Sequence, residues 1–265
     1  MAFSHIGAGS LTRFNSAASA NLIDLYEGLI DKEIQDNALE PKHKSFAPSQ
    51  FRCMRVSWFR LRGTQPDKIN VPDKGLQFTA DIGTACHEII QRRLAALGEL
   101  PDLEFAWIDV EDYLKENGLS AGITVTKKGY ETQIEMTVPY PIRFACDGIV
   151  IVTKETYLFE VKTVDHASFE ELVNPKPIHI DQVKLYCTLL HLDKVLFLYQ
   201  DRQYGGIKSF EYRVTESDKQ EVREKLKYVT EMVDANIAPE GLPKGDSWCS
   251  SNMCPYYKVC QEWGR

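Results

Sequence analysis

Two apolar runs that contain ionisable residues decide the fold: FACDGIV at residues 144–150 and YLFEVKT at residues 157–163. Both runs are rich in β-branched and aromatic residues, and a Lys-Glu turn at 154–155 predicts that they form an antiparallel hairpin. Residues two apart share a strand face, so Glu160 and Lys162 point the same way while Val161 points into the core. The expected turn pairs Asp147 with Lys162 and leaves Glu160 on the diagonal.

This hairpin would therefore carry two carboxylates and one amine on an otherwise apolar face. Burying these charges is costly unless a partner compensates them, and a divalent cation does so well. A solvent-exposed strand face with an ordinary cross-strand ion pair is the alternative.

Outward from the hairpin, helical and extended patterns alternate along the chain. Apolar residues recur with a helical period at 81–97, 109–117, 180–192 and 217–236. Strands are expected at 123–126, 130–138, 143–152, 156–164, 194–200 and 207–214, and the tail from Pro239 reads as irregular. The order predicts one α/β domain over residues 46–265, preceded by a helical extension at 1–45 whose residues 16–40 form an amphipathic helix.

Composition narrows the classes of protein. The chain has 265 residues, 43% of them hydrophobic, with 31 Lys and Arg against 38 Asp and Glu and a net charge of -7. This length and this hydrophobic fraction suffice for a buried core, and they exclude a disordered or collagen-like chain. No apolar run approaches the roughly 18 residues of a membrane helix, and the start lacks a secretory pattern, so we expect a cytosolic protein that needs no membrane.

Two helical stripes flank the hairpin. Gly83, His87 and Gln91 recur every four residues on one expected helix, and Gln182 and Tyr186 do so on another. Taken singly, His87 is an ordinary packed or surface histidine, and the Gln/Tyr pair is an ordinary polar edge.

Taken together, Gly-x-x-x-His87, Asp147, Glu160-x-Lys162 and Gln182-x-x-x-Tyr186 form an ordered set. In this set the chain resembles the PD-(D/E)XK nuclease superfamily and, within it, the RecB-like branch that includes the CRISPR-associated RecB-family exonucleases. The resemblance covers roughly residues 46–265. It implies a restriction-endonuclease-like αβββαβ core with a mixed sheet, and a DNA exonuclease, expected to prefer single-stranded ends, in recombination and repair, phage DNA processing or CRISPR spacer acquisition.

The resemblance also implies roles for the residues. A Mn2+ or Mg2+ ion would be held by His87, Asp147, Glu160 and the Val161 main-chain carbonyl, and an imidazole ligand favours Mn2+. Lys162 would stabilise the attacking hydroxide and the pentacovalent phosphate. Gln182 and Tyr186 would position Lys162 or contact the DNA backbone.

The cysteines suggest a second metal site. Cys249, Cys254 and Cys260 form a C-x4-C-x5-C pattern, and Cys53 is the best candidate for a fourth ligand. In the family that the chain resembles, four such cysteines hold a 4Fe-4S cluster that joins the two ends of the nuclease domain, although the first gap there is two residues and not four. A Zn2+ site is the alternative. The remaining Cys86, Cys146 and Cys187 lie in apolar stretches and are expected in the core.

Four arginines lie within eleven residues, interleaved with aromatic residues and free of acids: Arg52, Arg55, Arg60 and Arg62. Basic and aromatic residues together suit a single-stranded nucleic acid, which would answer the objection raised by the acidic net charge. The alternative is a helix whose rings pack inward while its arginines are solvated.

Two rival functions remain. One is a catalytically silent DNA-binding or scaffold module that keeps the fold and the cluster, although the intact Glu160 and Lys162 pair argues against it. Besides DNA, the resemblance implies recombination or CRISPR adaptation partners. The other is a Zn-stabilised hydrolase of another phosphate ester.

Overall fold

We describe a computed structural model of the chain over residues 17–39, 44–67, 73–243, 245–251 and 253–263. The chain divides into two compact units, Met1–Pro41 with Ile69–Phe78, and Lys42–Lys68 with Thr79–Arg265. In the first unit, α1 (Ala17–Leu39) confirms the expected helix, and Lys74 forms ion pairs with Glu27 at 2.7 Å and Asp31 at 3.4 Å.

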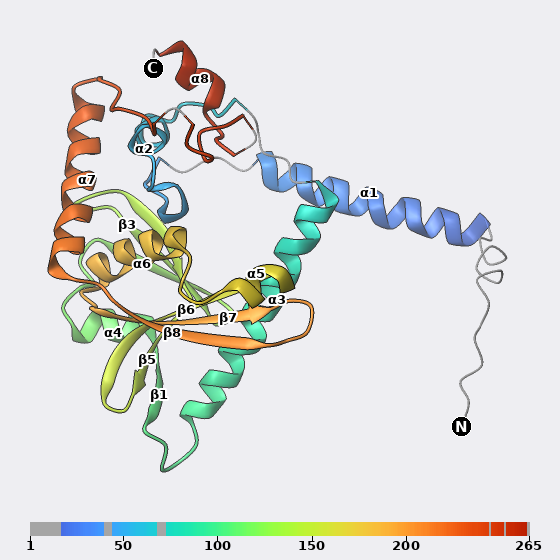
Figure 1. The fold of residues 1–265 in the computed structure, drawn as a ribbon, viewed down its shortest axis with the longest axis vertical. Coiled ribbons are helices and arrows are strands. Elements are labelled where there is room, and N and C mark those ends of the chain that lie inside the picture. The colour runs from blue at the N-terminus through green and yellow to red at the C-terminus, as the bar shows by residue number, and fades with distance from the viewer. Residues whose placement is uncertain (1–16, 40–43, 68–72, 244, 252, 264–265) are drawn as a thin grey trace. The chain divides into compact units, whose positions relative to one another are not determined.

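The second unit is built on a five-stranded mixed sheet in the order β1-β5-β6-β7-β8 (Figure 1). Its strands are β1 (Phe105–Ile108), β5 (Gly148–Val152), β6 (Glu155–Val164), β7 (Lys194–Asp201) and β8 (Ile207–Arg213). β6 and β7 run parallel, and the other neighbours run antiparallel. With α3 (Lys74–Gly98) and α6 (Pro177–Leu190), these strands give the order α3, β1, β5, β6, α6, β7, which is the expected αβββαβ order.

A second, three-stranded antiparallel sheet interrupts that order between β1 and β5. It contains β2 (Ile123–Lys128), β3 (Glu131–Met136) and β4 (Ile142–Cys146). The single strand expected at 143–152 is therefore wrong, because the chain leaves one sheet after Cys146 and enters the other at Gly148. Only Asp147 lies between them. The expected strands 123–126 and 130–138 exist, but they belong to this second sheet.

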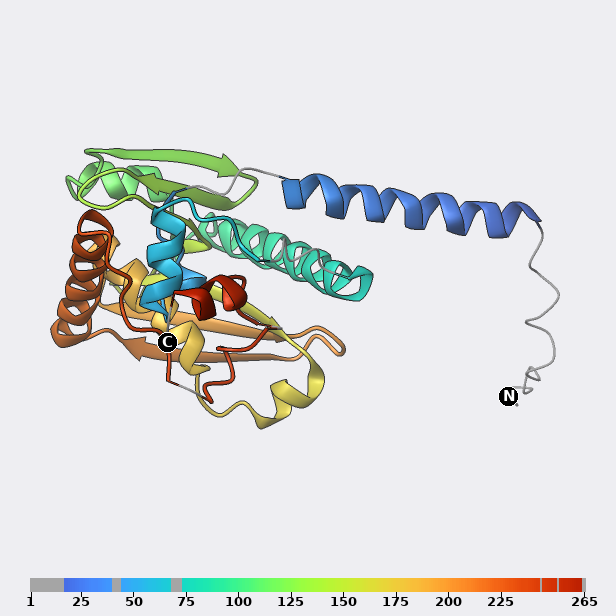
Figure 2. The same cartoon turned by 90° about the horizontal axis from the view of Figure 1, so that it is seen from above.

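Alternation along the strands places different side chains on the two faces of the five-stranded sheet. Val150, Phe159 and Val161 form one apolar cluster with Ile90 of α3. Leu158 and Phe197 belong to a larger cluster on the opposite face. Figures 1 and 2 show α6 and α7 (Glu216–Asp234) beside that part of the sheet. Val161 thus points into the core as expected, while its neighbours Glu160 and Lys162 face α6.

The register of the hairpin differs from the expected one. Val152 pairs with Glu155, so the turn consists of Thr153 and Lys154, both in the left-handed region with φ of 48° and 68°. A two-residue hairpin turn favours this conformation because its twist matches that of the strands. The pairing ends at Gly148 with Phe159, so its extension places Asp147 opposite Glu160 and not opposite Lys162. The shift is two residues, and the face is unchanged.

The C-terminal segment is not wholly irregular, because it contains α8 (Tyr257–Glu262). It lies against α2 (Met54–Leu61), where Trp58 is fully buried and donates its indole N–H to Met232 O at 3.1 Å. Phe59 stacks on Tyr256 with centroids 5.2 Å apart. The remaining short elements are α4 (Val110–Glu116), α5 (His166–Glu171) and a 3-10 helix at Pro48–Gln50.

Among the described residues, every helix is too short or too polar to cross a bilayer.

Gly148 gives a direct test of the point where the chain changes sheets. A Cβ at this position would lie 2.4 Å from Cη2 of the Trp107 indole, a rigid group that cannot yield as a flexible chain end does. We expect Gly148→Ala to lower the free energy of unfolding by about 1–3 kcal/mol through overpacking, measured by urea denaturation. Trp107→Leu should lower the added cost of Gly148→Ala to near zero in the double variant. A double variant whose loss equals the sum of the two single losses contradicts the steric explanation.

Candidate active site

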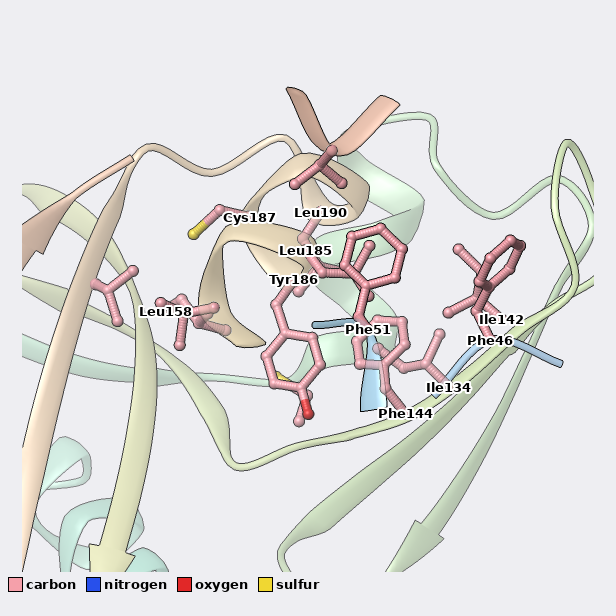
Figure 3. Packing of buried hydrophobic residues seen from close by; sticks show 14 of the residues in the cluster. Phe46, Phe51, Ile134, Ile142, Phe144, Leu158, Leu185, Tyr186, Cys187 and Leu190 are labelled. Carbon is pink, nitrogen blue, oxygen red and sulfur yellow. The ribbon is translucent and has the colours of Figure 1, made fainter. Parts of the chain in front are cut away.

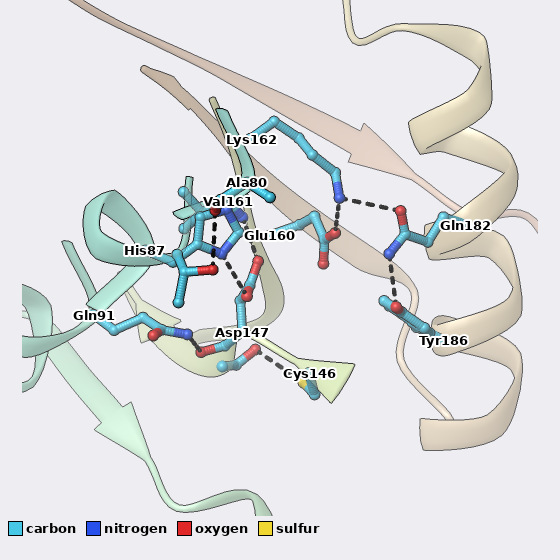
Figure 4. A network of polar contacts seen from close by, with 12 residues as sticks. Ala80, His87, Gln91, Cys146, Asp147, Glu160, Val161, Lys162, Gln182 and Tyr186 are labelled. Atoms are coloured by element: carbon cyan, nitrogen blue, oxygen red, sulfur yellow. Dashed lines mark hydrogen bonds and ion pairs between the residues drawn. The ribbon is translucent and has the colours of Figure 1, made fainter. Parts of the chain in front are cut away.

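Asp147 is the central residue of the site. Its Oδ1 lies 3.1 Å from His87 Nδ1, and its Oδ2 accepts the Val161 main-chain N–H at 2.8 Å. Gln91, one turn beyond His87 on α3, donates its side-chain amide to the Asp147 carbonyl at 2.8 Å. The carboxylate is therefore fixed between α3 and β6 where the chain changes sheets (Figure 4).

Glu160 and Lys162 form a buried ion pair beside it. Glu160 is only 2% exposed, and its Oε1 lies 2.6 Å from Lys162 Nζ. The other oxygen, Oε2, is buried and has no hydrogen-bond partner among the described residues. A buried carboxylate oxygen without a partner is costly, so this atom calls for a ligand.

A hydrogen-bond relay continues from Lys162 to α6. Lys162 Nζ donates to Gln182 Oε1 at 3.1 Å, and Gln182 Nε2 donates to Tyr186 Oη at 2.6 Å. Tyr186 is buried, and its ring stacks on Phe144 with centroids 4.7 Å apart, as the neighbouring rings in Figure 3 show. The relay, visible in Figure 4, fixes where the Lys162 ammonium lies.

The charges in the site do not balance by themselves. Burial raises the pKa of Glu160 to about 7, which outweighs the opposing Lys162 cation, and the Asp147 charge raises it further. Burial lowers the pKa of Lys162, but the charges of Glu160 and Asp147 outweigh this, so its pKa is raised. The pKa of His87 is also raised, because the hydrogen bond and charge of Asp147 outweigh burial. The site attracts positive charge.

The donor set suits a divalent cation. It offers the unpaired Glu160 Oε2, free lone pairs on Asp147, and the second ring nitrogen of His87, whose Nδ1 already contacts a carboxylate, as metal-bound histidines commonly do. In an extended strand, the N–H and C=O of one residue point to the same side, so the Val161 carbonyl faces the Asp147 side. Within the described ranges, no three His, Cys, Asp or Glu side chains are already arranged around one metal position. The carboxylates of Glu160 and Asp147 contact Lys162 and His87 instead.

The four cysteines with possible ligand roles are close neighbours in the second unit. Burial raises the pKa of the Cys254 thiol to about 11, and the charges of Cys53, Cys249 and Cys260 raise it further. Arg55, which is 7% exposed, donates to Cys260 Sγ at 3.6 Å and to Pro239 O at 2.6 Å. Cys53 is therefore near the C-terminal cysteines and a buried cation, although no three of the described thiols are already arranged around one metal position.

The other arginines of the predicted DNA-binding group also contact the chain itself. Arg52 pairs with Asp246 at 2.9 Å, and Arg60 donates to Ser45 O at 3.1 Å. Arg62 stacks over Trp58 and hydrogen-bonds the Asn236 side chain. Each arginine thus has a structural partner, and their contact with DNA stays a prediction.

The other three cysteines differ in burial. Cys146 and Cys187 are fully buried, as expected of core residues. Cys86 is only partly buried on α3, so its expected place in the core is wrong. The exposed sequence neighbours of Cys86, Ala85 and Glu88, show that it lies near the edge of the buried helix face.

Sequence reasoning did not assign site roles to three residues next to the motifs. Gln91 was visible as the last member of the α3 stripe, four residues after His87. Tyr199 lies opposite Lys162 in the parallel β6–β7 register, and His179 Nδ1 lies 2.7 Å from its hydroxyl. The spacing of His179, three residues before Gln182, is the one signal that could have identified it.

Comparisons with known proteins give distant structural likenesses only. No family model and no curated protein matches the chain. The solved structure of SSO0001 is 14% identical, with a TM-score of 0.46 over 88% of this chain and 97% of that one. LHK-Exo in complex with dAMP is 17% identical, with a TM-score of 0.44 over 74% and 90% of the two chains. The alkaline exonuclease LHK-Exo from Laribacter hongkongensis, in a further structure, is 15% identical, with a TM-score of 0.40 over 76% and 93%. Likeness at this level identifies no reaction for the chain.

The raised pKa of Glu160 predicts an unusual dependence of stability on pH. The folded protein holds this proton up to about pH 7, whereas an ordinary glutamate releases it near 4.5. Glu160 therefore contributes stability below about pH 4.5 that is lost as the pH rises through 7. Without metal, we expect Glu160→Gln to exceed the wild type in unfolding free energy by about 1–3 kcal/mol above pH 7, with the difference shrinking toward pH 4.5.

Urea denaturation at several pH values measures this, with chelator present. Asp218→Asn is the control of opposite sign. Although burial raises the pKa of Asp218, hydrogen bonds from Lys184 and Thr215 lower it. This variant should be less stable than the wild type at neutral pH, with the difference vanishing in acid. A Glu160→Gln protein that is less stable than the wild type at pH 8 would show that ionised Glu160 is favoured.

Proposed function

We propose that the chain is a metal-dependent nuclease that hydrolyses phosphodiester bonds of DNA from its ends. The observation that carries this proposal is the buried Glu160 carboxylate, which has one oxygen on Lys162 and one oxygen without a partner, beside Asp147. Two buried carboxylates, one of them with an oxygen that lacks a hydrogen-bond partner among the described residues, and a lysine on the same strand face suit a reaction in which negative charge builds up on a phosphate.

A Mg2+ or Mn2+ ion held by Asp147, Glu160, His87 and the Val161 carbonyl would supply an acidified water and neutralise phosphate charge. The chain's own residues have separate tasks. Asp147 fixes His87 and the Val161 main chain relative to each other. The Lys162 ammonium remains charged and donates hydrogen bonds toward the position of the reacting phosphate oxygens.

Gln182 and Tyr186 position the Lys162 ammonium in this proposal. Lys162 loses its contact with Glu160 if that carboxylate turns to a cation, and Gln182 Oε1 then keeps the ammonium in place. Tyr186, held by stacking on Phe144, keeps the Gln182 amide oriented. Buried as it is, Tyr186 acts through Gln182 and not on the DNA.

We further propose that Cys53, Cys249, Cys254 and Cys260 bind a 4Fe-4S cluster, with Zn2+ as the alternative. Four neighbouring thiols carry a strongly negative charge once they ligate a metal, and the buried Arg55 guanidinium beside Cys260 offsets part of it. Ligation would add to the contacts that already hold α2 against the C-terminal segment.

Replacement of Glu160 tests the catalytic proposal. We expect Glu160→Gln to lower the cleavage rate about 1,000-fold or more, because it removes a ligand charge while keeping the volume of the side chain. The assay is digestion of end-labelled linear DNA, single-stranded and duplex, with Mn2+ or Mg2+. Circular DNA distinguishes exonuclease from endonuclease activity.

Glu155→Gln is the matched control for this assay, since Glu155 lies on the same strand but pairs with Lys194 at the far end. It should cleave normally. Wild-type protein that binds DNA without cleaving it supports a silent binding module instead. Unchanged cleavage by Glu160→Gln overturns the assignment of Glu160.

The cysteine proposal predicts that replacing either of two cysteines far apart in the sequence causes the same loss of bound metal. Cys53→Ala should lose bound metal as completely as Cys254→Ala, despite their separation in sequence, because a four-thiolate site lacks a ligand in either variant. Cys187→Ala, in the apolar core, should keep the metal. Iron, sulfide and zinc contents after anaerobic purification, with visible absorption, provide the measurement. Full metal content in Cys53→Ala excludes it as the fourth ligand, and a colourless zinc protein excludes the cluster.

A further inference from the structure

Tyr199 and His179 form a polar pair beside the Lys162 relay that the proposed mechanism does not use. Tyr199 is fully buried on β7, directly opposite Lys162 in the parallel register. Its hydroxyl accepts the main-chain N–H of Lys176 at 3.1 Å and lies 2.7 Å from His179 Nδ1. His179 itself lies in the first turn of α6 and is partly exposed.

These contacts determine which ring nitrogen of His179 carries the proton. A main-chain N–H can only donate, so the single Tyr199 proton remains available, and Nδ1 is its one acceptor among the described residues. If Nδ1 donated instead, a buried hydroxyl proton would have no partner. Burial, together with the charges of Lys162 and Lys176, lowers the pKa of His179 to about 3, so the ring is neutral. Nδ1 accepts, and Nε2 carries the hydrogen.

The Nε2–H group therefore points away from Tyr199 and is free to bind a ligand. No acceptor for it lies within the described part of the chain. His179, Gln182 and Tyr186 are spaced by three and four residues, so they share the α6 face that holds Lys162. The neighbouring Lys176 ammonium also forms no ion pair with any described residue. One fixed neutral donor and the Lys176 ammonium, whose charge acts on His179 and on the exposed Asp165, make this corner of the site suitable for an anion.

We propose that His179 Nε2–H and the Lys176 ammonium bind a backbone phosphate of the DNA strand, next to the phosphate that is cleaved. This inference rests on the proposed nuclease function and adds a substrate subsite at the start of α6. Tyr199 is a positioning residue in it, because it acts only by fixing the His179 tautomer. The alternative is that the His179–Tyr199 bond merely braces α6 against β7.

A matched pair of variants separates the two roles of the ring. Asparagine places an oxygen near the position of Nδ1, so His179→Asn keeps the acceptor for Tyr199 and loses the distal donor. Glutamine places an amide near the position of Nε2, so His179→Gln keeps the donor and loses the brace. Both are compared in full-length protein carrying Glu160→Gln, by fluorescence anisotropy with a labelled single-stranded oligonucleotide and no divalent metal.

We expect His179→Asn to weaken binding about 10-fold and His179→Gln less than about 3-fold, with thermal midpoints close to the parent in both. Salt dependence adds a second measurement. Lys176→Gln should lower the slope of log K against log salt by about 1, whereas His179→Asn should leave it unchanged, because a neutral donor releases no counterion.

Three outcomes contradict the inference in distinguishable ways. Binding by His179→Asn as tight as the parent, with weaker binding by His179→Gln, assigns the pair to bracing. Equal binding by all variants removes the subsite and leaves the nuclease proposal intact. A Glu160→Gln parent that does not bind DNA, together with wild-type protein that does not cleave DNA with Mn2+, overturns the nuclease proposal and the subsite with it.

Discussion

The second unit depends on one carboxylate at a strand switch. Between β4 and β5 the chain leaves one sheet and enters another, and the residue at that point cannot continue the backbone ladder with β6. The Val161 N–H would then have no partner in the core, and Asp147 Oδ2 accepts it in place of a main-chain carbonyl. The same side chain contacts His87, and its main-chain carbonyl accepts from Gln91. One residue therefore joins two sheets and a helix, and the chemistry that we propose uses the lone pairs that remain.

The second constraint is the charge buried next to that switch. Glu160 and Lys162 lie on the face that α6 covers, where burial outweighs their attraction and leaves the pKa of Glu160 near neutrality, at about 7. An isolated ion pair of this kind stabilises a fold weakly at best, because desolvation cancels most of its Coulomb energy. The two carboxylates are more easily understood as a binding site that is costly without its cation than as a structural ion pair. The relay through Gln182 and Tyr186 also fits a binding site better than a structural role. It keeps the Lys162 ammonium oriented, although burying the polar groups of the relay costs free energy.

Local pattern predicted much of this arrangement. A period of two assigned the faces of β6 correctly, and the spacings at His87 and Gln182 identified helix faces that do reach Asp147 and Lys162. The switch at Asp147 was missed although Asp147 and Gly148 have low strand propensity, because the residues on both sides are strand-like and pairing with β3 or β6 is decided by distant residues. The turn was misplaced by one residue because Thr153 and Lys154 are not usual left-handed residues. β1 was missed since four residues give too little pattern, and its strand is defined by pairing with β5.

Net charge is the remaining difficulty for a chain proposed to bind a polyanion. The arginines on and around α2 do not fully compensate the negative net charge, because Arg55 is buried against Cys260 and Pro239, and Arg52 is neutralised by Asp246. Burial also lowers the pKa of Arg60, which makes it a structural group more than a surface charge. Within the described part of the chain, the Lys176 ammonium at the start of α6 forms no salt bridge, and its charge acts on both His179 and Asp165. The negative net charge of -7 then has a consequence of its own: it disfavours unspecific binding of DNA, so that binding depends on the few cations near the proposed cleavage site.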